Sequence, residues 1–128
     1  MGRTRTELSK KNQFWISKHR YYELKHFCLQ YREWQELYLR AISQTLDERD
    51  DPTGEYAALA ADLEWAMHLV KDTALGTDKV LGPFIFDHAV NGTNYVKLST
   101  VYNMPCGKDL FYKFVQKFFW LLSVEKGL

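Results

Sequence analysis

The chain has 128 residues, which is enough for one domain whose hydrophobic core needs neither disulfides nor a metal. Hydrophobic residues make up 46% and aromatic residues 16% of the chain, and this composition excludes an intrinsically disordered protein. The formal net charge of +1 argues weakly against nucleic-acid binding, but it is unevenly distributed: residues 1–26 carry +5, residues 47–64 carry −6 and residues 91–128 carry +3. Both ends are therefore basic, and either could form a local phosphate-binding face.

The first half of the chain predicts helices. Residues 1–16 are expected to form a flexible basic N-terminus, and residues 17–75 an N-terminal helical part. Ser17 can cap a helix, because its hydroxyl can accept a backbone N–H of the first turn. Apolar side chains then recur at helical spacing, at Tyr21, Leu24, Phe27, Cys28, Tyr31, Trp34, Leu37, Tyr38 and Ile42. This pattern fits one long helix or two helices that break near residues 30–32.

The middle of the chain predicts a linker and two further helices. The acidic stretch Asp47–Gly54 contains a proline and ends in a glycine, as linkers often do. Thr53 can cap the next helix, which we expect to end at Gly76. Residues 76–128 then form the C-terminal part, in which Pro83 either kinks a short helix or marks its first turn. Strand signals are nearly absent, so the predicted fold is all-α, a single compact helical bundle ending in a helix-turn-helix.

Residues 93–122 carry the helix-turn-helix prediction. A two-turn helix is expected to start at residues 93–94, and a tight turn follows at residues 102–105. Met104 is the one apolar residue placed to fill the angle between the two helices. A longer helix from about Gly107 is then expected to bury Leu110, Phe111, Phe114, Val115, Phe118, Leu121 and Leu122.

A helix-turn-helix binds DNA through its second helix, which presents outward side chains to base edges and phosphates in the major groove. The outward positions predicted for that helix are Lys108, Asp109, Tyr112, Lys113, Gln116 and Lys117. Asn94 and Lys97, from the first helix, are predicted to contact the DNA backbone. The expected partner is therefore double-stranded DNA, and lysine–phosphate contacts would make the affinity fall with salt.

The chain resembles the phage late-gene transcription regulators of the ArpU/RinA type, whose C-terminal helix-turn-helix is similar to region 4 of sigma factors. The resemblance rests on YYELKHFCLQYREW at 21–34, GTNYVKL at 92–98, NMPCGKDLFY at 103–112 and KFFWLL at 117–122. Asn103 replaces the usual turn glycine, and asparagine tolerates the left-handed conformation that such a turn needs. The resemblance implies a protein of the bacterial cytoplasm that activates phage late genes, directly or with RNA polymerase.

No enzyme, cofactor or metal is predicted, because no catalytic motif is present and the four histidines (His19, His26, His68 and His88) are scattered without ligand spacing. Cys28 and Cys106 lie far apart and outside any CxxC pattern, which favours reduced thiols in a cytoplasmic protein. The longest apolar run, Phe118–Leu122, is too short for a membrane span, and the charged start leads into no signal segment. We therefore expect no membrane partner and no secretion.

Three further interpretations stay open. Phe119 and Trp120 fall toward the outer face of the last predicted helix, where they could form a homodimer contact or a polymerase-facing patch. The rival to DNA binding is a protein-interaction module, such as a phage inhibitor of a host or defence protein that keeps the helix-turn-helix shape. The near-neutral charge and the acidic residues 47–64 favour this rival. A third alternative is a DNA-packaging accessory protein that pairs with a large terminase chain.

Overall fold

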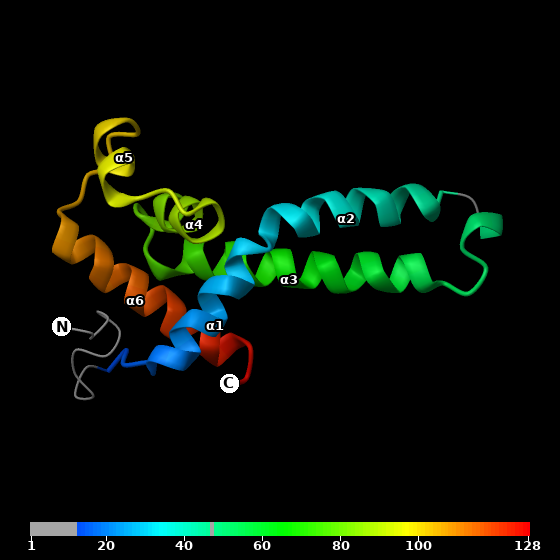
Figure 1. The fold of residues 1–128 in the computed structure, drawn as a ribbon, viewed down its shortest axis with the longest axis horizontal. Coiled ribbons are helices and arrows are strands. Elements are labelled where there is room, and N and C mark those ends of the chain that lie inside the picture. Colours follow the sequence, from blue (N-terminus) through cyan, green and yellow to red (C-terminus); the bar gives the residue numbers. More distant parts are fainter. Residues whose placement is uncertain (1–12, 47) are drawn as a thin grey trace.

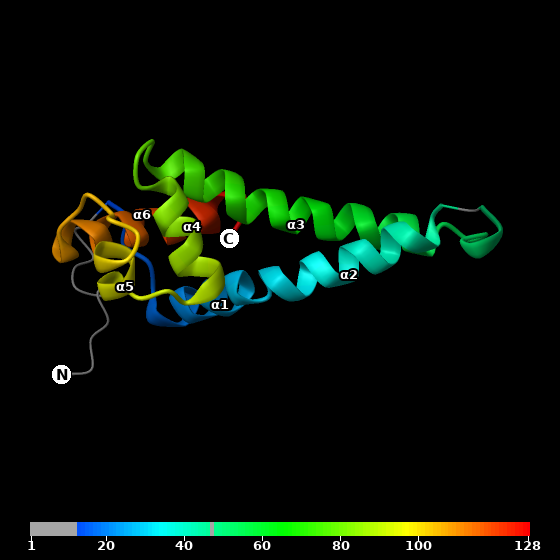
Figure 2. The ribbon, with the colours of Figure 1, turned by 90° about the horizontal axis from the view of Figure 1, so that it is seen from above.

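A computed structural model describes residues 13–46 and 48–128, and within these ranges every regular element is a helix, so the predicted all-α class is confirmed. The elements are α1 (Lys18–Leu29), α2 (Tyr31–Gln44), the 3-10 helix η2 (Glu48–Asp50), α3 (Glu55–Thr77), α4 (Gly82–Asn91), α5 (Tyr95–Thr100) and α6 (Lys108–Glu125). The helix α2 and the N-terminal half of α3 form an antiparallel hairpin that projects from the other helices (Figure 1). The same projection is visible from above (Figure 2).

The core lies where the C-terminal half of α3 packs against α4 and α6, with α1 covering α4 and α6 from the other side. Nine side chains with almost no exposed surface fill it: Leu24, Cys28, Val70, Ile85, Leu98, Phe111, Phe118, Phe119 and Leu122. Burial raises the pKa of the Cys28 thiol to about 12, so this cysteine behaves as a small apolar side chain.

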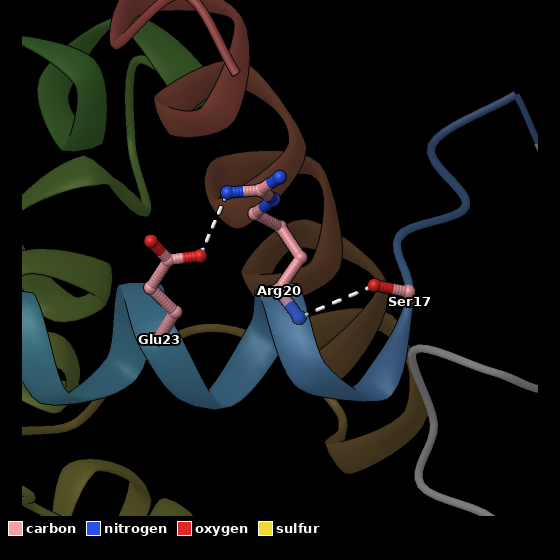
Figure 3. Close-up of polar contacts among 3 residues, drawn as sticks. All are labelled: Ser17, Arg20 and Glu23. Carbon is pink, nitrogen blue, oxygen red and sulfur yellow. Dashed lines mark hydrogen bonds and ion pairs between the residues drawn. The ribbon is translucent and has the colours of Figure 1, made fainter.

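Ser17 caps α1 as predicted, since its Oγ accepts the backbone N–H of Arg20 at 3.2 Å. Arg20 also pairs with Glu23, with Nη1 and Oε1 2.7 Å apart (Figure 3). Both side chains are more than one third exposed, so this ion pair contributes little to stability. Residues 1–12 of the predicted flexible N-terminus lie outside the described residues. Ile16 is buried and the Phe14 ring contacts Trp120, so the packed chain begins before Ser17.

The helical stretch after Ser17 consists of two helices, which is the second of the two expected alternatives. At Gln30 the backbone N–H bonds the carbonyl of Phe27 at 3.2 Å, three residues back. This tighter bond interrupts the α-helical ladder and ends α1 at Leu29. The interruption lets α2 leave the body of the protein and pair with α3.

The predicted cap of α3 is wrong. The N-cap is Gly54, in the left-handed conformation at φ 73°, and the side-chain cap comes from Asp51. The Asp51 carboxylate accepts the backbone N–H groups of Tyr56 and Ala57, each at 3.1 Å. A carboxylate has two acceptor oxygens and a charge that suits the positive end of a helix, so it caps α3 better than the Thr53 hydroxyl would.

The turn into α4 is tight and brings two backbones close together. The Asp78 carboxylate accepts the N–H groups of Val80 at 2.9 Å and Leu81 at 2.8 Å. Pro83 lies in the first turn of α4, so it starts this helix and causes no kink. Gly82 is buried against α3, where a Cβ atom would lie 2.8 Å from the Cα of Leu75.

This close approach predicts opposite effects for two glycine-to-alanine changes. Gly82→Ala would place a methyl group against backbone atoms that cannot move aside, and we expect it to lower the free energy of unfolding by about 1–3 kcal/mol. Gly76→Ala, in α3, meets nothing within 4 Å and should raise stability by roughly 0.5–1 kcal/mol. Urea unfolding followed by circular dichroism measures both. Equal effects of the two changes would contradict the close packing of α4 on α3.

Candidate nucleic-acid interface

The helix α5 carries the first two predicted contact residues on its surface. Asn94 is the N-cap, and its Oδ1 accepts the backbone N–H of Lys97 at 2.9 Å. Both residues are exposed, whereas Leu98 is fully buried and fastens α5 to the core. The cap uses the Asn94 carbonyl oxygen, which leaves its amide NH₂ as the group suited to a phosphate.

The turn between α5 and α6 has two features that the sequence predicts. Asn103 takes the left-handed conformation, at φ 54°. Met104 is buried, and its N–H bonds the carbonyl of Leu98 at 3.0 Å. Both predictions are confirmed. The left-handed residue reverses the chain direction, and the methionine side chain fills the angle behind it.

Phe111 sets the orientation of α6. It is fully buried, and its ring lies 5.3 Å from that of His88 in α4 and 6.0 Å from that of Tyr95 in α5. The Tyr95 hydroxyl also donates to the carbonyl of Cys106 at 2.9 Å, just before α6 begins. Helices α4 and α5 therefore both hold the N-terminal half of α6 in place.

His88 connects this packing to the loop between α4 and α5. Its Nδ1 lies 2.8 Å from the carbonyl of Thr93, and because a carbonyl can only accept, Nδ1 carries the proton. Burial lowers the pKa of His88, so the ring is neutral at pH 7. Asp87 fixes the same loop by accepting from Asn91 at 2.6 Å and from the Thr93 hydroxyl at 3.0 Å.

The predicted contact residues of α6 fall into three groups. Lys108, Asp109 and Lys113 are exposed. Lys117 and Tyr112 are partly buried: the Lys117 ammonium lies 5.8 Å from the centre of the Phe14 ring, and the Tyr112 ring lies 6.0 Å from that of His88. Gln116 is buried, with 6% of its surface exposed. Lys108, Asp109 and Lys113 are therefore accessible to a ligand, and Gln116 is not.

Two predictions for α6 are wrong. Gln116 cannot reach a base edge, since it lies on the same flank as Phe119 and Ser123, which are also buried. Leu110 was expected in the core but is 52% exposed, and Phe111 is the first buried residue of the helix. The helix is therefore rotated by about one residue from the predicted face. The rotation follows from the larger apolar area that Phe111 buries compared with Leu110.

The predicted outer patch at Phe119 and Trp120 is also wrong, because Phe119 is buried. Phe119 belongs to the core, and its ring packs against that of Tyr21 in α1 at 5.1 Å. Trp120 is partly covered by Phe14. The sequence could not reveal this because α1 and the residues before it cover a face of α6 that would otherwise be exposed.

The structure adds residues that the sequence analysis did not assign to the site. Val96 in α5, Val101 at its C-terminus and Leu110 in α6 are all more than half exposed, close in sequence to the exposed lysines. We use "α5–α6 surface" for the exposed residues Val96, Lys97, Val101, Lys108, Asp109, Leu110 and Lys113. This surface combines ammonium groups with apolar side chains, and that combination can contact phosphates and thymine methyl groups.

Two searches of the described residues gave negative results. There, no three His, Cys, Asp or Glu side chains come together as a metal site would require. Nor does any described helix have the length and apolar character to cross a bilayer. A comparison of the chain with protein-family models, curated proteins and solved structures finds no match. The α5–α6 surface is therefore judged on its geometry alone.

The buried neutral His88 predicts a pH-dependent stability. Its pKa is lowered in the folded state from the ordinary 6.5, so the unfolded chain takes up the proton first as the pH falls. The stability contributed by neutral His88 is complete above the unfolded pKa of 6.5 and declines as the pH falls below it. Thermal unfolding between about pH 7 and pH 5.5 should show a steeper fall in Tm for the wild type than for His88→Gln, which does not titrate. Parallel Tm profiles would contradict a buried neutral imidazole.

Proposed function

We propose that this chain binds double-stranded DNA, with α5, the turn and α6 acting as a helix-turn-helix and the N-terminal half of α6 entering the major groove. One observation carries the proposal. Lys113 projects into solvent from the side of α6 opposite the buried Phe111, and Lys108 is exposed at the start of the same helix. Cationic side chains on a rigid, exposed helix start are what phosphate contacts require.

The distribution of charge supports the same proposal. The hairpin of residues 31–77, here called the arm, has four basic and ten acidic side chains, a formal charge of −6. The described residues outside it, 13–30 and 78–128, here called the body, have nine basic and five acidic side chains, a formal charge of +4. Figure 1 shows α5 and the start of α6 at the end of the molecule opposite the tip of the arm. A polyanion approaching this end meets the basic body and avoids the acidic arm.

The geometry suggests a role for each contact residue. Lys97, Lys108 and Lys113 fit phosphate oxygens, and they would supply most of the affinity. Asp109 fits the amino group of cytosine and Leu110 a thymine methyl group, because both side chains are exposed in the first turn of α6. Lys117 adds a phosphate contact from further along the helix, and Asn94 adds one from the cap of α5.

The other two residues predicted on α6 do not contact DNA in this proposal. Tyr112 is partly buried beside His88, so we give it a positioning role. Gln116 is left out because it is buried. The resemblance to ArpU/RinA-type regulators extends the proposal to activation of phage late genes together with RNA polymerase.

A second function is favoured by one specific observation. Val96, Val101 and Leu110 give the α5–α6 surface an apolar character that exceeds the needs of phosphate contacts. Exposed apolar side chains on consecutive helices are a feature that protein-binding surfaces use. The alternative is therefore a protein-interaction module that keeps this helical arrangement without binding DNA, such as an inhibitor of a host protein.

Salt-dependent DNA binding separates these functions. Fluorescence anisotropy with a labelled mixed-sequence duplex, from about 50 to 200 mM salt, should show affinity that falls with salt. The double variant Lys113→Ala/Lys117→Ala should bind roughly tenfold more weakly at low salt. It should also reduce the slope of log K against log salt by about two, because each lost phosphate contact removes about one.

The matched control removes two charges elsewhere. Lys71→Ala/Lys79→Ala lowers the net charge equally, but both residues lie outside α5 and α6, and we expect an unchanged slope. Equal losses in the two double variants would indicate only a general charge effect and contradict a site on α6. No binding of the wild type even at low salt would favour the interaction module.

A further inference from the structure

The arm exposes large apolar side chains that nothing in the structure covers. Among the described residues, Leu46 and Leu39 are the most exposed large hydrophobic side chains, at 83% and 68%. Leu39 lies in α2, and Leu46 follows two residues after that helix ends. Apolar side chains exposed this fully on a projecting element mark an interaction surface rather than a core.

The exposed leucine of α2 belongs to a groove between the two helices of the arm. The groove has a volume of about 580 Å³ and is lined by Arg32, Gln35, Glu36, Tyr38, Leu39 and Met67. Its inner residues, Tyr38 and Met67, are partly buried, and Leu39 stands at its edge. A groove between two antiparallel helices, with an apolar side chain at its edge, fits another helix by ridges-into-grooves packing.

The sequence of α2 also indicates that a second side of this helix can pack against a neighbour. One apolar stripe, with Tyr31, Trp34 and Ala41, is buried in the protein. A second stripe contains Leu39 and Ile42, which are three residues apart and therefore share a side of the helix. A helix with two apolar stripes packs on two sides, so α2 has room for a neighbour beyond α3. Two hairpins that pair in this way form a four-helix bundle.

Charge identifies the neighbour. The tip of the arm, residues 47–55, has five acidic side chains and one basic side chain, whereas the body carries a formal charge of +4. If two arms pair in antiparallel orientation, each acidic tip lies beside the base of the other arm, where the basic body of the partner begins. Parallel pairing would instead bring the two acidic tips together, which is unfavourable. Two copies of the chain are thus complementary in charge when their arms are antiparallel.

We propose that the arm pairs with the arm of a second copy of this chain, in antiparallel orientation, and that the Leu39 groove forms the centre of the interface. Such an interface is isologous, since the same surface of each copy contacts its counterpart. The helix α2 has 14 residues and is therefore about 21 Å long, so the interface is small and we expect a reversible dimer. This inference does not depend on DNA binding.

Sedimentation velocity tests the pairing directly. The wild-type sedimentation coefficient should shift from monomer to dimer as the concentration rises from about 1 µM to about 1 mM. Leu39→Glu should remain monomeric over this range, with an unchanged circular dichroism spectrum, because the side chain is exposed in the monomer. Rising salt should weaken the dimer, since opposite poles attract each other in the proposed orientation.

The control is Val80→Glu, which also places a carboxylate on an exposed apolar position, here 59% exposed and outside the arm. This variant should dimerise like the wild type. A wild type that stays monomeric at the highest concentration, or a Leu39→Glu variant that dimerises normally, would overturn the proposal. In either case the groove would be left for a different protein partner.

The orientation has its own test. A photo-crosslinking amino acid at the exposed position Thr53, near the tip, should attach to α1 or α4 of the other copy near the base of its arm. Peptide mapping by mass spectrometry locates the attachment. Attachment to the other tip would show parallel pairing and refute the antiparallel interface.

Discussion

The burial of Phe111 is the constraint on which the rest of the candidate site depends. Its ring lies between His88 of α4 and Tyr95 of α5, and no part of it reaches solvent. Once Phe111 points inward, the 3.6-residue period of the helix decides the direction of every other side chain in α6. Lys113, two residues further on, then points outward, whereas Gln116 is buried because the flank of α6 that carries Phe119 and Ser123 is covered as well. A neutral His88 supports this packing, because a charged ring would be costly beside two aromatic rings away from water.

The two ends of the molecule differ in charge. The basic body holds the α5–α6 surface, and the acidic arm points away from it (Figures 1 and 2). The break at Gln30 makes this possible, because a continuous helix would keep residues 31–44 in line with α1. The arm then pairs α2 with α3 over its length and leaves Leu39 exposed. The proposals of DNA binding and arm pairing therefore rest on separate surfaces.

Much of the fold could be predicted from the sequence, because helical spacing and turn chemistry are local signals. The Ser17 cap, the role of Pro83, the left-handed Asn103 and the buried Met104 are all of this kind. The rotation of α6 could not be predicted, because positions 110 and 111 are both apolar. Only tertiary packing decides which of the two side chains is buried. The Asp51 cap was missed since its carboxylate reaches helix N–H groups five and six residues away. Burial of Phe119 depends on α1, far away in the sequence.

The most direct test of the account is a titration of isotopically labelled protein with a DNA duplex, followed by the chemical shifts of backbone amides. We predict that the largest changes occur at Lys97 and along residues 108–117, with shifts elsewhere falling away toward the tip of the arm. Added salt should reverse them, since the contacts are ionic. Changes centred on the arm, or no changes at low salt, would contradict the account, because the basic end of the molecule would then not be the surface that meets DNA.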